Sequence, residues 1–342
     1  MRFAGIDIGS EKHFIAVVDE DGAVVTKATG LGESAEGYEK LRALLGEPRE
    51  ILVAMEATGH YWQNLFATLA GYGYRMALLN PVRTARFAEE EMRRTKTDAI
   101  DALGIAQFTR QKRPPATAVP EEGALELREL VRLRDRLVQD LGDHVRQLHR
   151  IVDLGFPEFT TLVRDLSSEL ATSILSRYPT ARAFDDVSEG ELANMRGGRH
   201  TVGRALAKQI LALAKKSVGM HHGPSYRVQA EYACEDISTL RRRIKKLEGD
   251  ISDTLRKHEV GTLLTTIDGI GDTTAARLVA ELGDITRFKS ADAIAAYVGV
   301  VPGLKQSGKR NGQRAGLAHM GHAALRARLW MPVELSPVSR TV

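Results

Sequence analysis

This 342-residue chain has a single cysteine, no long apolar run and only a small excess of charge of one sign. The lone thiol of Cys234 excludes a disulfide framework and is typical of proteins of a reducing cytosol. No apolar run approaches the roughly 20 residues that cross a membrane, and the N-terminus enters a predicted strand almost at once. The sequence therefore predicts a soluble, cytoplasmic protein with neither a membrane span nor a signal peptide.

The charge balance identifies no partner by itself, because 48 lysines and arginines face 44 aspartates and glutamates, a net charge of +4. The distribution of charge is more informative, since residues 301–330 contain no acid. A cationic segment of this kind attracts phosphate groups. We therefore expect the C-terminal region to bind nucleic acid, through cations that include Lys305, Lys309, Arg310 and Arg314.

The length favours two or three domains, and the first is predicted to span residues 1–115. Short strands come first and then alternate with helices, which predicts an α/β layer with a mixed sheet. A further helix carries Asp98 and Asp101, runs to about Lys112 and stops before two prolines. The expected strands are residues 3–8, 14–18, 23–26, 51–55 and 76–79, and the expected earlier helices include residues 36–45 and 61–69.

The middle of the chain, residues 116–260, is predicted to contain two long helical arms. Apolar residues recur at steps of three and four over 130–152 and again over 237–255, between charged residues. This pattern is typical of a coiled coil, and two helices of an ordinary bundle are the alternative. Pairing of the arms within the chain, association with another protomer, or both would fit. The stretch between the arms, about 155–222, resembles a small helical domain with a basic segment at 196–200, whose role the sequence does not reveal.

The last domain, residues 261–342, is expected to be mostly α-helical. An apolar-x-Gly-apolar-Gly turn that contains Gly269 and Gly271 precedes a helical run, which is the helix-hairpin-helix pattern. Backbone amides at such a turn can meet a DNA phosphate at a helix N-terminus. A polar, glycine-rich loop is expected at residues 306–312, and it contains Ser307.

Four acids in the first third of the chain have the order and setting that a two-metal nuclease site requires. Asp7 lies in one buried-strand pattern and Glu56 ends another, while Asp98 and Asp101 share one face of a helix. Carboxylates gathered at strand ends repel one another, and divalent cations are the usual counter-charge. Two Mg²⁺ ions about 4 Å apart can activate one phosphodiester oxygen and stabilise the leaving one. These residues point to phosphoryl transfer on nucleic acid.

Each acid also has a simpler interpretation. Residues around Asp7 could open the phosphate-binding hairpin of a sugar kinase or actin-like ATPase, but the long arms leave no room for the duplicated domain of that class. Glu56 could be an idle carboxylate at a strand end. Asp98 and Asp101 could be a helix N-cap and a first-turn acid. The basic cluster just ahead of them, which contains Arg93, Arg94 and Lys96, would draw phosphate to the metals.

Ser307 is usually the kind of serine found in any loop. Its cationic neighbours favour chemistry, because Lys305, Lys309 and Arg310 could hold a scissile phosphate and stabilise charge that develops on it. A serine nucleophile would form a covalent phosphoserine linkage and conserve the energy of the broken bond for rejoining. His319 and His322 lie nearby in sequence, without a third residue to complete a hydrolase triad.

Taken together, these motifs resemble the DEDD transposases of bacterial insertion sequences of the IS one-ten class, which are recombinases directed by a bridge RNA. The matching sequence motifs occur in the same order as in the family, from residue 1 to about residue 332. They are Gly5-Ile6-Asp7, Glu56-Ala57-Thr58-Gly59-x-Tyr61, Asn80-Pro81, Lys96-Thr97-Asp98-x-x-Asp101-Ala102, Gln111-Lys112-Arg113-Pro114, Ile267-x-Gly269-Ile270-Gly271, Ser307-Gly308, Gly321-His322, Leu325-Arg326 and Met331-Pro332.

The resemblance implies an RNase H-like (RuvC-like) first domain whose Mg²⁺ ligands are Asp7, Glu56, Asp98 and Asp101. It implies that Ser307 is the nucleophile and that a serine of one subunit works with the acidic site of another, in a dimer or a dimer of dimers. It further implies that a structured RNA pairs with target and donor DNA. Two departures stand out: family members continue well past the Met-Pro motif, and residues 317–320 replace a common serine or threonine and a lysine. A structure-specific RuvC-like nuclease and a degenerate nucleic-acid-binding transposase are the alternative functions.

Overall fold

A computed structural model describes residues 1–90, 97–119, 121–307, 310–317, 321–323, 325–327 and 329 of the chain. The chain divides into two compact units, Met1–Val119 and Pro120–Val342. Within the described ranges, no helix combines the length and the apolar character that crossing a membrane requires.

The first unit is built on a five-stranded mixed sheet with the strand order β3-β2-β1-β4-β5. Strands β1, β2 and β3 pair antiparallel, whereas β4 runs parallel to both β1 and β5. This order and these directions agree with the expected RNase H-like α/β layer. Strand β3 is longer than the expected strand at 23–26, because it pairs with β2 as far as Gly32. The strands are β1 (Arg2–Asp7), β2 (Lys12–Val18), β3 (Val24–Gly32), β4 (Ile51–Glu56) and β5 (Arg75–Leu79).

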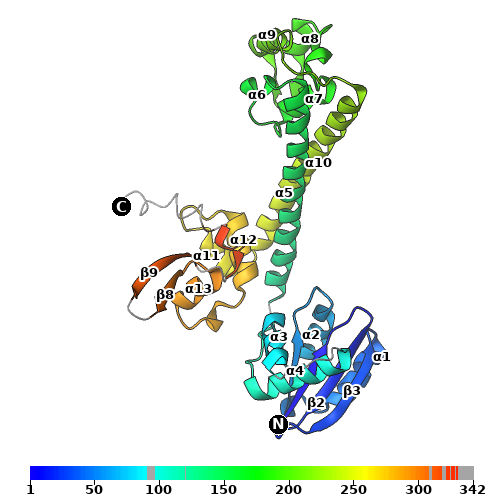
Figure 1. Cartoon of the computed structure of the whole chain (residues 1–342), viewed down its shortest axis with the longest axis vertical. Helices are drawn as coiled ribbons and strands as arrows, with labels where there is room; N and C mark the ends of the chain where they lie inside the picture. Colours follow the sequence, from blue (N-terminus) through cyan, green and yellow to red (C-terminus); the bar gives the residue numbers. More distant parts are fainter. Residues whose placement is uncertain are drawn as a thin grey trace. The chain divides into compact units, whose positions relative to one another are not determined.

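Helices cover both faces of this sheet. One face packs its Ile6, Val53 and Met55 against helices α1 and α2, and the other packs Phe3 and Leu52 against helices α3 and α4. Figure 1 shows α3 and α4 together on the second face. Asp7 and Glu56 therefore end two strands, β1 and β4, that are buried on both faces of the sheet. The helices are α1 (Ala35–Leu45), α2 (Trp62–Gly71), α3 (Pro81–Glu90) and α4 (Asp98–Lys112), with a short 3-10 turn η1 (Pro48–Glu50) before β4.

Gly5 allows α4 to pass directly over β1. A Cβ atom on this glycine would lie 2.2 Å from the backbone nitrogen of Ala106 and 2.3 Å from the backbone oxygen of Ala102. No larger residue fits at this crossing without moving the helix. The glycine of the Gly5-Ile6-Asp7 motif thus fixes the distance between strand β1 and the helix that carries Asp98 and Asp101.

The two predicted arms are the helices α5 (Glu122–Gly155) and α10 (Pro224–Leu255). They pack against each other within the chain as an antiparallel hairpin (Figure 1). Arg134 of α5 binds Glu248 of α10 at 2.7 Å, and farther along the pair His144 lies 3.5 Å from Asp236. Of the arrangements left open by the sequence, pairing within the chain is the one observed here.

A small helical insert joins the far ends of the two arms (Figure 1). Its core contains Phe156, Phe159, Ile174 and Phe184, all buried, and it continues into Ile237 of α10. The insert consists of α6 (Phe159–Leu162), α7 (Glu169–Arg177), the 3-10 turn η2 (Ala181–Phe184), α8 (Glu189–Asn194), the strand pair β6 (Arg196–Gly197) and β7 (His200–Thr201), and α9 (Gly203–Ala214).

The C-terminal region returns to the beginning of α5. Leu127 and Val131 of α5 share a core with Ile251 of α10 and with Ala276 and Val279 of α12. The region consists of α11 (Glu259–Leu264), α12 (Asp272–Leu282), the 3-10 turn η3 (Ile285–Arg287), α13 (Ala291–Val298), β8 (Pro302–Ser307) and β9 (Arg310–Leu317).

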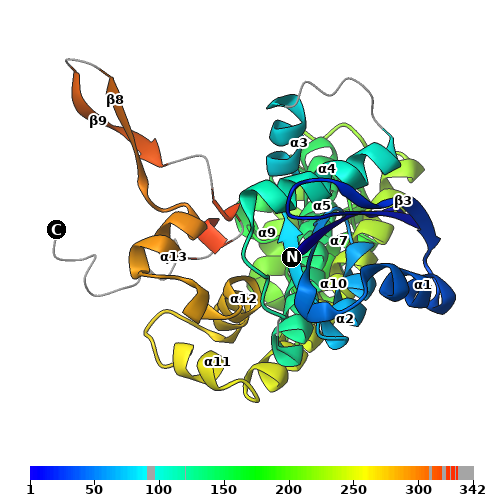
Figure 2. The ribbon, with the colours of Figure 1, turned by 90° about the horizontal axis from the view of Figure 1, so that it is seen from below.

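The expectation of a loop at residues 306–312 was wrong. Strands β8 and β9 pair antiparallel, and Ser307 pairs with Arg310. Only two residues separate these strands, which suits a tight hairpin, and the many polar and glycine residues concealed the strand pattern. Figure 2 shows the hairpin extending away from α12 and α13. The C-terminal region is therefore mostly, but not wholly, helical.

Candidate active site

Asp7 and Glu56 end neighbouring parallel strands side by side. Ile6 of β1 is in register with Met55 of β4, so Asp7 and Glu56 are the next residues along the two strands. Side chains in register on parallel neighbours project to the same face of a sheet. Phe3 and Leu52, which are an even number of residues before them, pack on α3 and α4. Both carboxylates therefore belong to the face that α3 and α4 cover.

Helix α4 begins with the other two acids. Asp98 is its first residue, and Asp101 follows one turn later. Ala102 and Ile105 continue this stripe and pack towards the sheet at the point where α4 crosses Gly5. The interpretation of Asp98 as the N-cap was wrong, because the hydroxyl of Thr97 caps the helix and accepts a hydrogen bond from the backbone N–H of Ile100 at 3.3 Å. Asp98 is thus left free of the capping role.

Thr84 is a neighbour of this site that the sequence did not reveal. Its hydroxyl lies in the first turn and a half of α3 and donates a hydrogen bond to Oε1 of Glu56 at 2.6 Å. Thr84 is only 8% exposed, so this contact is shielded from water. The hydrogen bond holds one carboxylate oxygen of Glu56 and so restricts rotation of the carboxylate. The sequence signal was its position one turn after Asn80-Pro81, which was too weak to single it out.

The four acids suit a hard divalent cation in kind and in placement. They offer carboxylate oxygens only, they belong to elements that meet at one face of the sheet, and all four are at least partly exposed. Among the residues that the structure describes, however, no three His, Cys, Asp or Glu side chains stand close enough to bind one metal ion. The donor set therefore fits Mg²⁺, and binding would require the carboxylates to draw together.

The predicted cations around these acids fall outside the described ranges. Arg93, Arg94 and Lys96 belong to the segment 91–96 between α3 and α4. Their place in the sequence still puts them immediately before the N-cap of α4.

The predicted serine nucleophile lies on a strand. Ser307 is the last residue of β8, and the register of the hairpin pairs Lys305 with Gln313 and Leu304 with Arg314. Arg310 is the first residue of β9. The backbone thus gathers Ser307 and Arg310 at one end of the hairpin, while Lys309 lies outside the described residues.

The predicted helix-hairpin-helix turn joins two short helices. Gly269 has a positive φ of 87°, which only glycine adopts without strain, and Gly271 is the N-cap of α12. The amide of Ile270 donates to the carbonyl of Ile267 at 3.0 Å. The turn therefore ends at a helix N-terminus, as the pattern requires for an approaching anion.

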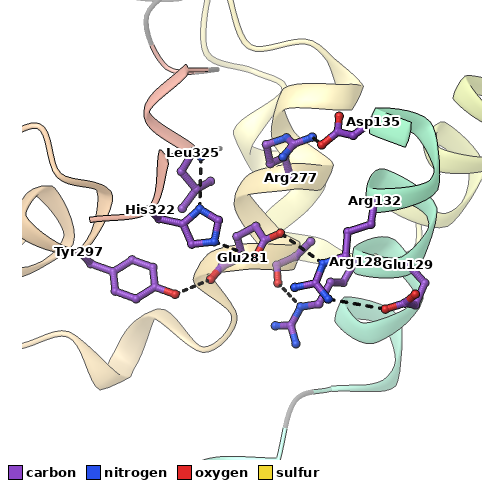
Figure 3. A network of polar contacts seen from close by, with 10 residues as sticks. Arg128, Glu129, Arg132, Asp135, Arg277, Glu281, Tyr297, His322 and Leu325 are labelled. Carbon is purple, nitrogen blue, oxygen red and sulfur yellow. Dashed lines mark hydrogen bonds and ion pairs between the residues drawn. The ribbon is translucent and has the colours of Figure 1, made fainter. Parts of the chain in front are cut away.

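A polar network fixes this C-terminal region on the first arm (Figure 3). Arg277 of α12 is 2% exposed and pairs with Asp135 of α5. Glu281 of α12 lies between two partners: His322 at 3.1 Å and Arg132 of α5 at 3.8 Å. The sequence singled out His322 without finding a partner for it. Glu281, 41 residues earlier, is that partner, and only the tertiary structure reveals it.

Two family models match the chain in order along its length. A model described as "Transposase", of the DEDD type, matches residues 4–157, and one described as "Transposase IS116/IS110/IS902 family" matches residues 261–341. The first contains the four acids, and the second contains Ser307, Gly269 and Gly271.

Curated relatives match over most of the chain. An insertion element IS116 protein of Streptomyces clavuligerus is 27% identical over 91% of this chain and 78% of that protein. A mini-circle putative transposase for IS117 of Streptomyces coelicolor is 27% identical over 90% of this chain and 78% of its own length. The pilin gene-inverting protein of Moraxella bovis is 24% identical over 84% of this chain and 67% of that protein.

Solved structures of RuvC from Thermus thermophilus also match. One, in complex with a Holliday junction substrate, is 18% identical, with a TM-score of 0.25, and covers 34% of this chain and 99% of that chain. Another is 21% identical, with a TM-score of 0.26. The fold assignment rests instead on the strand order of the sheet. Because two transposase models match both ends of the chain in family order and the relatives span most of it, this protein belongs to the IS110-type transposase family and is a DNA transposase or recombinase.

Proposed function

We propose that this transposase cuts DNA in a Mg²⁺-dependent reaction and exchanges the strands through a covalent Ser307–phosphate intermediate. The observation that carries the proposal is the register of β1 and β4, which places Asp7 and Glu56 side by side on the face that α4 covers. Acids on two neighbouring strand ends and one helix start are the arrangement that a two-metal phosphodiester site needs.

Each acidic residue has a role in this proposal. Asp7, Glu56, Asp98 and Asp101 would hold two Mg²⁺ ions per site, and Thr84 would keep Glu56 turned towards them. Bound Mg²⁺ would supply Lewis-acid activation of a phosphodiester oxygen and neutralise the charge that develops on it. Arg93, Arg94 and Lys96 would bring the phosphate to the site.

Ser307 would attack the scissile phosphorus. One phosphoester bond of DNA breaks while the Oγ–phosphorus bond forms, so the number of phosphoester bonds is unchanged and the strand can later be rejoined. Lys305, Lys309, Arg310 and Arg314 would bind the phosphate around the serine. The amides at Gly269 and Gly271 would contact a DNA phosphate farther along the duplex.

The partners in this proposal are target and donor DNA and a structured bridge RNA that selects them. The similarity to a pilin gene-inverting protein supports site-specific rearrangement of DNA. Subunits would assemble as a dimer or a dimer of dimers, with the arms α5 and α10 acting as coiled-coil elements that also meet a second copy.

Trapping on a suicide DNA substrate, in which a nick prevents rejoining, tests the proposal. We expect a covalent protein–DNA adduct with the wild-type chain and none with Ser307→Ala or Asp7→Asn. Cleavage that survives Ser307→Ala would favour a RuvC-like nuclease that uses water. Binding of DNA with neither cleavage nor adduct would identify a transposase remnant. Sequencing the RNA that copurifies tests the guide: RNA that maps to non-coding sequence beside the gene supports it, and random cellular RNA contradicts it.

A further inference from the structure

The helical insert contains a long stretch without any acid. Residues 192–230 include no aspartate or glutamate, although acids make up 44 of the 342 residues of the chain. The same stretch contains the cations Arg196, Arg199, Arg204, Lys208, Lys215, Lys216 and Arg227. This stretch carries only positive charge, whereas the arms carry both signs. Because like charges repel one another, the cations must either be widely separated or bind an anionic partner.

Helix α9 separates its cations from its apolar side chains. Ala207 and Ile210 are fully buried in the core of the insert, with Leu206 and Leu211 packed beside them. Arg204, Lys208 and Lys215 are all exposed, and their spacing of four and seven residues puts them on the same side of the helix axis. This stripe is about 16 Å long. One face of the helix is therefore a row of cations.

The β6–β7 hairpin adds Arg199 at the start of this row. Its turn contains Gly198, with φ of 61°, and the exposed Arg199, and the exposed imidazole of His200 begins β7. The amide of Val202 donates to the carbonyl of Met195 at 3.0 Å and closes the hairpin directly before α9 begins at Gly203. The hairpin turn and the first turn of α9 are thus adjacent in the structure.

Several other cations of this unit have a partner within the chain. Arg134 binds Glu248, Arg277 binds Asp135 and Arg241 binds Ser167. Within the ranges that the structure describes, none of the exposed cations just named on the hairpin and α9, nor Lys216, forms an ion pair. Acids lie near these cations: helix α8, which packs on α9, carries Glu189 and Glu191, and the carboxylate of Glu169 on α7 lies against Gly198 of the hairpin. Glu191 accepts a hydrogen bond from the hydroxyl of Tyr178 at 2.8 Å, and within the described residues none of the three acids forms an ion pair with these cations. These charges are therefore available to an external anion.

We propose that this surface, Arg199, His200, Arg204, Lys208, Lys215 and Lys216, binds the phosphodiester backbone of nucleic acid. A row of cations matches a polymer with regularly spaced charges, whereas a single small anion would engage only one or two of them. Ala205 and Ala212 are exposed beside the row, and these small side chains let a backbone approach closely. These six residues include no Phe, Tyr or Trp, and His200 is the one ring among them, so backbone contact is the main mode that the surface supports.

This inference rests on the proposed function and adds a nucleic-acid surface outside the acidic site and outside the β8–β9 hairpin that carries Ser307 (the serine hairpin). The phosphodiester backbone could belong to DNA or to RNA, and the test separates the two. Binding is measured on the full-length chain with a short DNA duplex and with an RNA hairpin of the same stem length. The test variant is Arg204→Glu with Lys208→Glu. The matched control is Arg177→Glu with Arg182→Glu, which changes the charge equally at exposed positions on other elements of the same insert.

We expect the test variant to bind one or both probes about 10-fold more weakly at moderate salt, and the slope of log K against log salt to fall by about 2. Whichever probe loses affinity identifies the source of the backbone. Any of three results would overturn the proposal. The control could lose as much affinity as the test variant, or the test variant could lose none with either probe. Alternatively, polyglutamate could displace the probe as efficiently as unlabelled nucleic acid does. Circular dichroism, and the milder pair Arg204→Gln with Lys208→Gln, separate lost binding from lost folding. Because the readout is binding, the proposal can hold even in a protein that never forms the Ser307 adduct.

Discussion

His322 and Glu281 join the chain beyond the β8–β9 hairpin to helix α12, with 3.1 Å between Nε2 and Oε2. Glu281 is only 9% exposed and also lies 3.8 Å from Nε of Arg132 on α5. One carboxylate therefore connects three elements: the first arm, α12 and the segment that follows the serine hairpin. We infer that this contact helps to hold the serine hairpin at a defined place in its own unit.

Replacing Glu281 tests this role. Glu281→Ala leaves His322 and Arg132 without their shared acceptor, and because both side chains are partly exposed we expect the second unit to lose about 1 kcal/mol of stability. Glu281→Gln keeps one oxygen acceptor and should cost less. Thermal or urea unfolding of both variants gives the comparison, and an alanine variant as stable as the glutamine variant would contradict the role of the carboxylate oxygens.

Thr84 is predicted to position Glu56. Thr84→Val removes the hydroxyl with little change in volume, so we expect the rate of strand cleavage to fall about 10-fold while DNA affinity stays unchanged. Thr84→Ser keeps the donor and should restore most of the rate.

Asp7→Asn and Glu56→Gln remove charge without volume and should abolish cleavage but leave DNA and RNA binding intact. Cleavage by either carboxamide variant in Mg²⁺ would overturn the assignment of the site.

Gly5 is predicted to tolerate no side chain. In Gly5→Ala the new Cβ would overlap the backbone of α4 at Ala102 and Ala106, and the helix would have to move. We expect a loss of about 3 kcal/mol or more in the stability of the first unit. Gly71→Ala is the matched control, because nothing lies within 4 Å of its added Cβ and alanine favours a helix. Similar stability of the two variants would show that α4 does not approach β1 as closely as described.

Cys234 is predicted to resist alkylation while the protein is folded. Burial raises the pKa of its thiol from 9.0 to about 12, which lowers the thiolate fraction near pH 8 about 1000-fold. The folded pKa is the higher one, so this group stabilises the fold fully below the unfolded pKa and ceases to do so as the pH rises towards 12. Iodoacetamide should therefore react with the folded protein far more slowly than with a free thiol, and reaction should be complete in urea. Fast labelling in buffer would contradict the burial of the thiol.

The last prediction concerns which subunits share an active site. Arms of about 30 residues would reach on the order of 45 Å, and we expected them to separate Ser307 from the acids of its own chain. This expectation held unless the arms fold back as a hairpin, and α5 and α10 do so, returning α12 to the start of α5. The length of the arms therefore no longer supports a site shared between subunits. The prediction of a site shared between subunits now rests on the resemblance to the family. Mixtures of Asp7→Asn and Ser307→Ala chains should partly recover recombination, and no recovery at any ratio would establish a site within one chain.

Local sequence patterns were enough to predict most of the first unit. Short continuous apolar runs and turn signals located β1, β2, β4 and β5, since a strand that is buried on both faces is apolar along its length. The same reading identified the acids at the ends of β1 and β4 as candidates. The two arms were also predictable, because a repeat at steps of three and four persists over many turns.

Other features depend on contacts between distant residues, which no local pattern records. Two such contacts are the hydrogen bond from Thr84 to Glu56 and the pairing of Glu281 with His322, which join residues 28 and 41 positions apart. The folding of the arms onto each other likewise depends on contacts between residues far apart in the chain. The β8–β9 hairpin was missed because glycine and polar residues have low strand propensity, and pairing across the hairpin overrides that propensity. The sequence by itself determined the chemistry that this protein has available, whereas only the tertiary structure decided which residues support that chemistry, because support requires residues from different elements to meet.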